Sequence, residues 1–278
     1  MSSAAEPLEQ RWPRPAVMGV LNVTPDSFSD GGRFRSVDEA IAHGRRLAEE
    51  GASIVDVGGE STRPGAAAVS AGEELERVLP VLEGLEGISL SIDTSKATVA
   101  AEALECGAEM VNDVTALRGD AAMAGVVAEK GAYVCLMHMQ GDPRTMQVAP
   151  QYDDVVSEVF AFLEERVAFA VSQGIPEGRI CVDPGIGFGK TPDHNLELVR
   201  RLDALVALGR PVVVGLSRKS TLARVLGDDG PQGTASASVG AAVAAFERGA
   251  WMLRAHDVRE TVEALAVAAA VERGKVSA

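Results

Sequence analysis

The chain has 278 residues and a formal net charge of −14, with 46% hydrophobic and 24% charged residues. These values are typical of a globular protein with a sizeable core, built as one large α/β domain or two small ones. The acidic balance argues against a nucleic-acid partner, which usually meets a basic face. It leaves room for an anionic small-molecule substrate, because a few Arg and Lys residues suffice to hold one.

The cysteines and the N-terminal segment indicate a cytoplasmic protein with no membrane partner. Cys106, Cys135 and Cys181 are odd in number and form no C-x-x-C pair, so we expect buried, reduced thiols. Residues 1–15 contain no apolar segment typical of a secretory signal, and the longest apolar run, 264–271, is too short to cross a bilayer. We expect a flexible tail over residues 1–13 and a single domain over residues 14–274.

Eight short apolar runs, rich in Val, Ile and Leu, recur along the chain. They lie at 16–23, 53–59, 88–93, 109–113, 132–138, 179–185, 210–217 and 250–256. Each is mostly apolar on both faces, as expected for parallel strands that are covered on both sides. The runs therefore predict a buried parallel sheet.

Helix-like segments separate these runs, for example at 36–51, 94–107, 121–131 and 153–174. Ser36 with Glu39 and Asp257 with Glu260 fit capping boxes, and glycines follow the expected helix ends. Eight strand–helix alternations predict an α/β fold, a single (β/α)8 TIM barrel. The alternative is a doubly wound open sheet, but no G-x-G-x-x-G follows the first run.

Polar residues fall at the end of nearly every predicted strand, where barrels of this kind carry their chemistry. The ends carry Asn22, Thr62 and Arg63, Asp93, Asn112 and Asp113, His138, Asp183, Lys219, and Arg254 with His256. Any one of them could cap a turn or a helix, and for His138 rim structure and substrate contact both remain open. Capping does not explain all of them together, so the pattern predicts a site at one rim.

The polar residues divide into two chemistries. Asn22, Thr62, Arg63, Arg254 and His256 are donors or hard oxygen ligands, which suit a phosphate group and a Mg²⁺ ion. Asp93, Asn112, Asp183 and Lys219 offer acceptors, an amide and a cation, which suit the edge of a flat heterocycle. A carboxylate such as Asp183 can accept two parallel N–H bonds from an aminopyrimidine.

The first strand runs into an unusually long polar loop, "MGVLNVTPDSFSDGG", which also contains a lone Phe. With "IVDVGGESTRPGA", "SIDT", "MVNDV", "LMHMQGDPRTMQ", "DPGIGFGK", "GLSRKS" and "RAHDV", it resembles the dihydropteroate synthase family of the folate pathway, the target of sulfonamides. The resemblance covers roughly residues 14–270. The sequence departs from the family's usual pattern in the residue before His256 and in "NDVTAL" after the fourth strand.

This resemblance implies a transferase that joins 6-hydroxymethyl-7,8-dihydropterin diphosphate to p-aminobenzoate. It implies three sets of residues and one metal ligand. The pterin set is Asp93, Asn112, Asp183 and Lys219; the diphosphate set is Thr62, Arg63, Arg254 and His256; the p-aminobenzoate set is Phe28, Pro64, Phe188, Lys219 and Ser220. Asn22 would bind Mg²⁺, the expected cofactor, and the first two loops would close over the site.

If the C–O bond breaks first, the pterin methylene becomes a cation, which Asp30 of the first loop could stabilise. With Asp30, we take Lys219, Arg254 and His256 as the catalytic residues. The expected partners are the two substrates and sulfonamide inhibitors. The resemblance also suggests a homodimer, through residues 235–249 and 260–274. Two rivals remain: a pterin-binding methyltransferase acting on methyltetrahydrofolate, and a degenerate paralogue that binds pterin without turnover.

Overall fold

The structure, a computed structural model, describes residues 6–24, 37–61, 68–141 and 146–275. Its strands are β1 (Ala16–Asn22), β2 (Ile54–Gly58), β3 (Leu90–Asp93), β4 (Met110–Asp113), β5 (Tyr133–Met137), β6 (Ile180–Asp183), β7 (Val213–Val214) and β8 (Met252–Ala255). Its longer helices are α3 (Val37–Glu49), α4 (Ala71–Gly84), α5 (Ala97–Glu105), α6 (Met123–Lys130), α7 (Val155–Ser172), α8 (Pro192–Arg200), α11 (Ala235–Phe246) and α12 (Val258–Arg273). The shorter ones are α1 (Leu8–Arg11), η1 (Glu177–Arg179), α9 (Leu202–Val206) and α10 (Ser220–Val225).

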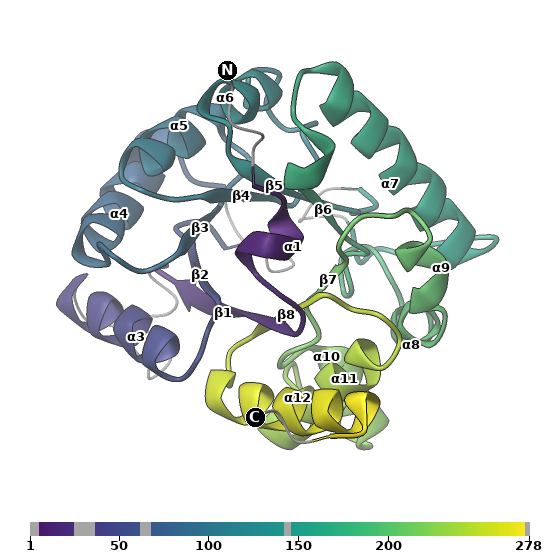
Figure 1. The fold of residues 1–278 in the computed structure, drawn as a ribbon. Coiled ribbons are helices and arrows are strands. Elements are labelled where there is room, and N and C mark those ends of the chain that lie inside the picture. Colours follow the sequence, from purple (N-terminus) through teal and green to yellow (C-terminus); the bar gives the residue numbers. More distant parts are fainter. Residues whose placement is uncertain (1–5, 25–36, 62–67, 142–145, 276–278) are drawn as a thin grey trace.

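The strands form one parallel sheet in the order β6-β5-β4-β3-β2-β1-β8-β7. A single bridge between Val182 and Val212, with the Val182 N–H donating to Pro211 O at 3.0 Å, joins β6 to β7 and closes the ring. This is the narrowest junction of the barrel, since β7 has only two residues. Figure 1 shows the ring of strands surrounded by helices, so the predicted (β/α)8 barrel is confirmed.

Local signals fix several helix starts. The side chains of Ser70, Asp154 and Thr234 accept hydrogen bonds from the first turns of α4, α7 and α11. Thr191 and His194 form a complete capping box at the start of α8. The capping box expected at Asp257 and Glu260 is not formed, because the Asp257 carboxylate pairs with Arg218. Ser36 lies outside the described residues.

The apolar core has two main parts. A large cluster fills the space between the sheet and the helices, and a second cluster fills the barrel, where Met18, Ile54, Met110 and Met252 are fully buried. Both faces of each strand are thus covered, which is why the strands read as continuous apolar runs. Cys135 and Cys181 lie in the barrel cluster as free thiols, and free Cys106 is partly buried.

Helix α1 lies across the end of the barrel where the strands begin, over the centre of the ring in Figure 1. Leu8 is fully buried and Trp12 is 2% exposed. The Trp12 ring meets the Tyr133 ring edge-on at 4.8 Å, and its Nε1 donates to Ser89 Oγ at 3.2 Å. Residues 8–12 therefore differ from the flexible tail expected for residues 1–13. The burial of two large apolar side chains offsets the entropy of ordering them.

Within the described residues, no helix is both long and apolar enough to cross a membrane.

Candidate functional site

The carboxyl ends of the strands bring buried polar side chains together above the apolar interior. Asp93, Asn112 and Asp183, from β3, β4 and β6, are 8%, 6% and 7% exposed. Asp93 and Asn112 are partners in the ladder between neighbouring strands. Buried polar groups need partners, because leaving one unsatisfied costs about 1–3 kcal/mol. A set of buried polar side chains at this depth, called the polar floor from here on, therefore indicates a ligand site rather than packing.

Arg254 on β8 connects two carboxylates of this floor. Its Nε donates to Asp56 Oδ2 at 2.7 Å, and its Nη2 donates to Asp93 Oδ2 at 2.9 Å. Asn112 Nδ2 donates to the same Asp56 oxygen at 2.9 Å. Asp56 is fully buried, and its Oδ1 has no hydrogen-bond partner among the described residues. This oxygen is an acceptor available to a bound donor.

Burial shifts the pKa values of the ionisable side chains in the floor. It raises the pKa of Asp93 to about 7; Arg254 opposes this effect, whereas the Asp56 carboxylate adds to it. It also raises the pKa of Asp183, against the nearby charge of Lys219. The pKa of Lys219 is lowered to about 8 by burial. A carboxyl group such as that of Asp93, which can exchange a proton near neutral pH, suits a heterocycle that presents both donors and acceptors.

Lys219 forms the boundary between the floor and the segment after β6. Its ammonium lies 4.8 Å from the centre of the Phe188 ring, and Nζ donates to the Ile186 carbonyl. Ser220 follows as the exposed first residue of α10. An aromatic ring beside a cation at the mouth of the floor offers a place for an aromatic acid.

His256 follows β8, two residues after Arg254. The Ser217 hydroxyl accepts from the His256 backbone N–H at 3.1 Å and lies 3.0 Å from its Nδ1. Because Oγ already accepts from the backbone, its own proton is available to Nδ1, and we assign the ring proton to Nε2 on this basis. His256 can then donate to an anion through Nε2.

Asn22 ends β1 at the same rim. A Cβ atom added at Gly58 would lie 3.7 Å from Asn22 Oδ1 and 3.6 Å from Asp93 Oδ2, so the missing side chain leaves space beside both oxygens. Among the described residues no group of three His, Cys, Asp or Glu side chains could hold a metal. One amide oxygen nevertheless fits Mg²⁺, which takes one or two protein ligands and completes its shell with waters and phosphate oxygens.

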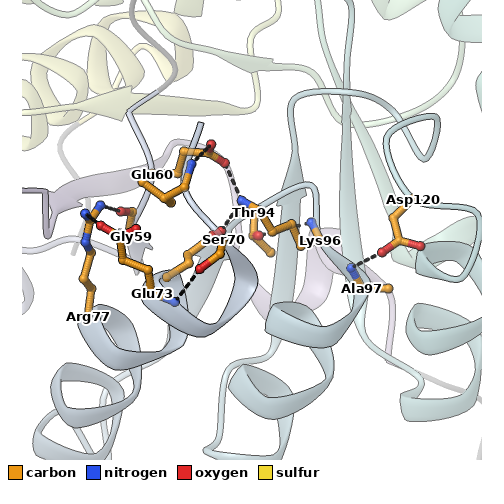
Figure 2. Close-up of polar contacts among 11 residues, drawn as sticks. Gly59, Glu60, Ser70, Glu73, Arg77, Thr94, Lys96, Ala97 and Asp120 are labelled. Atoms are coloured by element: carbon orange, nitrogen blue, oxygen red, sulfur yellow. Dashed lines mark hydrogen bonds and ion pairs between the residues drawn. The ribbon is translucent and has the colours of Figure 1, made fainter. Parts of the chain in front are cut away.

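The segment after β2 is held at both of its stems, as Figure 2 shows in part. Glu60 Oε1 accepts from the Val69 N–H at 3.0 Å, and Lys96 Nζ donates to Glu60 Oε2 at 2.6 Å and to Glu74 Oε2 at 2.5 Å. Arg77 Nη1 donates to Gly59 O at 2.7 Å. Of the residues predicted on the first two loops, Phe28, Asp30, Thr62, Arg63 and Pro64 lie outside the described residues.

Comparisons with known proteins agree with this geometry. A family model described as "Pterin binding enzyme" matches residues 18–256. The chain belongs to the pterin-binding enzyme family.

Several relatives of this pterin-binding enzyme are named dihydropteroate synthase. That of Escherichia coli (strain K12) is 47% identical over 264 residues, which cover 94% of this chain and 93% of the relative. The Xanthomonas albilineans enzyme, solved with 4-aminobenzoic acid, is 50% identical with a TM-score of 0.87, covering 94% of each chain. The Yersinia pestis enzyme, solved with a sulfonamide drug, is 45% identical with a TM-score of 0.89, covering 94% and 95%.

Most of the predicted site residues that lie in the described part of the pterin-binding enzyme are close together in the structure. Asp93, Asn112, Asp183, Lys219 and Arg254 surround one floor, with Asn22 and His256 at its rim. Arg254, predicted for the diphosphate, contacts Asp56 and Asp93 and so connects the two predicted sets. His138, which was left open, belongs to the rim: its buried ring accepts from Lys190.

Sequence reasoning missed Asp56 and Lys190 in the pterin-binding enzyme. Asp56 lies inside β2 between Val55 and Val57, not at a strand end where polar residues were sought. A carboxylate inside an otherwise apolar buried strand was the available signal, because such a group needs a partner. Lys190 ends the segment "DPGIGFGK", which taken alone resembles any glycine-rich loop.

Proposed function

We propose that this chain is a dihydropteroate synthase, a transferase that condenses 6-hydroxymethyl-7,8-dihydropterin diphosphate with p-aminobenzoate to give 7,8-dihydropteroate and diphosphate. The observation that carries the proposal is the polar floor of Asp56, Asp93, Asn112, Asp183 and Arg254, in a chain nearly half identical to enzymes of that name. The folate-pathway role follows from the product.

The pterin would lie on this floor. Asp183 would accept the parallel N–H donors of its aminopyrimidine edge, while Asn112 and Asp93 would satisfy the other ring edge. Lys219 would meet a ring nitrogen or carbonyl from the opposite side. A site built to satisfy every polar atom of its ligand discriminates strongly against analogues, because a missing partner leaves a buried group unpaired.

The diphosphate would occupy the rim, near Asn22 and His256. Thr62, Arg63 and His256 would donate to its oxygens, and Arg254 would add positive charge from the floor. Asn22 would hold Mg²⁺, which when bound supplies electrostatic stabilisation of the negative charge on the leaving group. These residues favour cleavage of the C–O bond because they stabilise the charge that develops on diphosphate.

The arylamine would then attack the pterin methylene. Phe28, Pro64, Phe188 and Ser220 would hold p-aminobenzoate, while Asp30 would stabilise the cationic methylene. The C–N bond forms as the amine donates its electron pair, and the amine then releases a proton. The neutral amine needs positioning more than deprotonation, and exclusion of water protects the cation from hydrolysis.

The decisive experiment measures dihydropteroate formation from both substrates, with and without Mg²⁺. We expect turnover that requires both substrates and falls when the metal is chelated. Pterin binding without turnover would identify a degenerate paralogue. Methyl transfer from methyltetrahydrofolate in place of condensation would identify the rival enzyme of the same barrel class.

The same function implies inhibition by sulfonamides, which resemble p-aminobenzoate. We expect a sulfonamide to compete with p-aminobenzoate in the turnover assay, because Phe28, Thr62 and Pro64 match the family pattern. The Yersinia pestis relative with its bound sulfonamide drug supports this expectation. Inhibition that added p-aminobenzoate does not relieve would count against it.

We also propose a cytoplasmic homodimer that pairs through α11 and α12. The helix α12 leaves Val267 and Val271 66% and 75% exposed, and a helix face with such residues is suited to packing on a second copy. Sedimentation analysis of the purified chain tests this pairing. A monomer at all concentrations would exclude the dimer.

A further inference from the structure

The carbonyl oxygens of the segment between β6 and α8 are held by side chains at five consecutive positions. Each carbonyl from residue 185 to residue 189 accepts a hydrogen bond from a side chain. The donors are Lys190 to Gly185 O and Phe188 O, both at 3.0 Å, Lys219 to Ile186 O, Gln147 to Gly187 O at 2.5 Å, and Tyr152 to Gly189 O at 2.8 Å. A surface loop usually leaves its carbonyls to water, whereas side chains bind all five carbonyls of this one and so restrain it.

Lys190 makes the largest share of these contacts. Its side chain is buried, with 2% of the residue exposed, and Nζ also lies 2.8 Å from His138 Nδ1 and 3.4 Å from His138 O. Within the described residues it forms no ion pair. Burial lowers the pKa of Lys190 to about 7, while the charge of Asp183 favours the ammonium form. The converging carbonyl dipoles also stabilise the ammonium.

The charge of Lys190 also fixes its histidine partner. Burial and, to a smaller extent, the neighbouring charge of Lys190 lower the pKa of His138 to about 3, so the imidazole is neutral. A neutral ring with Nδ1 as acceptor is the partner that an ammonium requires. His138 directly follows β5, so Lys190 connects the segment after β6 to the end of the adjacent strand.

Three glycines allow the segment to curl around Lys190. Gly185, Gly187 and Gly189 have φ values of 67°, 82° and 65°, in the left-handed region that favours glycine. A Cβ atom at Gly185 would lie 1.8 Å from His138 O. The curl presents Phe188 to Lys219, at the mouth of the pterin floor.

We propose that Lys190 is a positioning residue for the arylamine substrate. It holds the segment 185–189 so that the Phe188 ring and the Lys219 ammonium line the pocket next to the pterin methylene. The proposal rests on the proposed function, since it assigns that pocket to p-aminobenzoate. Lys190 itself contacts neither substrate; it acts through the carbonyls that it binds.

The opposite end of the barrel offers a matched control. Arg14 Nη2 donates to Phe246 O at 2.8 Å, its Nε donates to Ala250 O at 3.1 Å, and its guanidinium carbon lies 4.1 Å from the centre of the Phe246 ring. Arg14 is therefore another cation that holds two carbonyls beside a Phe, away from the site; unlike Lys190 it also pairs with a carboxylate, that of Glu272, at 3.3 Å. Lys190→Met and Arg14→Met each remove such a cation and keep an apolar stem.

The experiment compares steady-state kinetics and amide hydrogen exchange of the wild type and the two variants. For Lys190→Met we expect the KM for p-aminobenzoate to rise about tenfold or more, because small displacements of positioning groups have large kinetic effects. The KM for the pterin diphosphate should change much less, and exchange should accelerate in residues 185–190. For Arg14→Met we expect faster exchange near residues 246–250 with both KM values unchanged.

Equal loss for both substrates, or a similar loss in Arg14→Met, would overturn the proposal in favour of a general role in stability. If Lys190→Met fails to fold, Tyr152→Phe and Gln147→Ala each remove one carbonyl partner, and we expect a smaller selective rise in the same KM. No change in either would overturn it as well. Failure of the proposed function would appear separately, as a wild type that does not turn over although exchange in residues 185–190 still depends on Lys190.

Discussion

Asp93 connects the chemistry of the site to the stability of the barrel at the scale of one residue. Its pKa is raised to about 7 by burial, well above the ordinary value for an aspartate. Between about pH 4 and pH 7 the folded protein therefore holds a proton that the unfolded chain has lost. For this group, stability falls as the pH rises through that window.

Asp93→Asn should remove this pH-dependent cost. At pH 8 we expect its melting temperature, without substrates, to exceed that of the wild type by about 3–6 °C, and the difference should shrink at pH 5. Pterin binding should be lost. Thermal unfolding at both pH values and calorimetric titration with a pterin check both parts.

Asp120 provides the control with the opposite sign. Backbone N–H groups of Ala122 and Ala97 donate to its carboxylate and lower its pKa. Its contribution is present above the unfolded pKa and is lost as the pH falls, so Asp120→Asn should destabilise at pH 8. A melting temperature of Asp93→Asn that does not exceed the wild type's at pH 8 would contradict the burial argument.

Ser217 orients His256 and should affect turnover without touching the pterin. Ser217→Ala removes the hydroxyl that contacts both the backbone N–H and Nδ1 of His256. We expect kcat to fall about fivefold, the worth of one ordinary hydrogen bond, with pterin affinity unchanged. Ser172→Ala, at the end of α7, is the neutral control. An unaltered kcat would show that His256 is held by other contacts.

Single residues also show where sequence reasoning reaches its limit. Asp93, Asn112, Asp183 and Arg254 could be predicted because parallel strands bring residues near their carboxyl ends to one rim. The partnership of Asp56 with Arg254 could not, because it joins β2 to β8 across β1 and depends on the pairing of the first strand with the last. The geometry of Lys190, likewise, depends on carbonyl directions that residue types do not reveal.

At the scale of elements, the stems after β2 and β3 are joined by one lysine. Lys96 pairs with Glu60 and with Glu74, whose side chain is fully buried. Burial alone would lower the pKa of Lys96, but the two carboxylates raise it, so the ion pair persists. This arrangement ties α4, α5 and the stem of the second loop together.

Lys96→Met should therefore destabilise strongly. It leaves two carboxylates unpaired, one of them buried, and we expect the free energy of unfolding to fall by about 2–4 kcal/mol. Lys130→Met is the matched control, because Lys130 pairs with Glu105, whose side chain is 64% exposed. Urea denaturation measures both. Similar small losses in the two variants would mean that Glu74 is neutralised in another way.

Helices and strands differ in how well they can be predicted from the sequence. The eight strands could be predicted because each is buried on both faces and therefore mostly apolar. Helix α1 has four residues, too few for a periodic pattern, so its burial under the barrel could not be seen. At Asp257 a local signal was misleading, since the Arg218 guanidinium competes for the carboxylate that a capping box would use.

At the scale of the whole molecule, residues that stabilise the fold and residues that form the site lie at opposite ends of the barrel. Trp12 seals the end where the strands begin, while the site lies where they end. Trp12→Ala should lower the free energy of unfolding by about 3–5 kcal/mol through loss of packing, with both KM values unchanged. Leu196→Ala, at a side chain 42% exposed on α8, is the apolar control. Altered KM values would show that the two ends communicate.

The narrow junction between β6 and β7 divides the site as well as the barrel. Asp93, Asn112 and Asp183 precede it in the chain, whereas Lys219, Arg254 and His256 follow it. The part of the chain after this junction can dock on the part before it through β8, which pairs with β1 over four residues. A chain cut at exposed Gly209 would therefore yield two fragments, neither of which carries a complete set of catalytic groups. Recovery of turnover when the two fragments are mixed would show that they associate. The barrel could then serve as a split enzyme whose activity on its own substrate reports the association of the fragments.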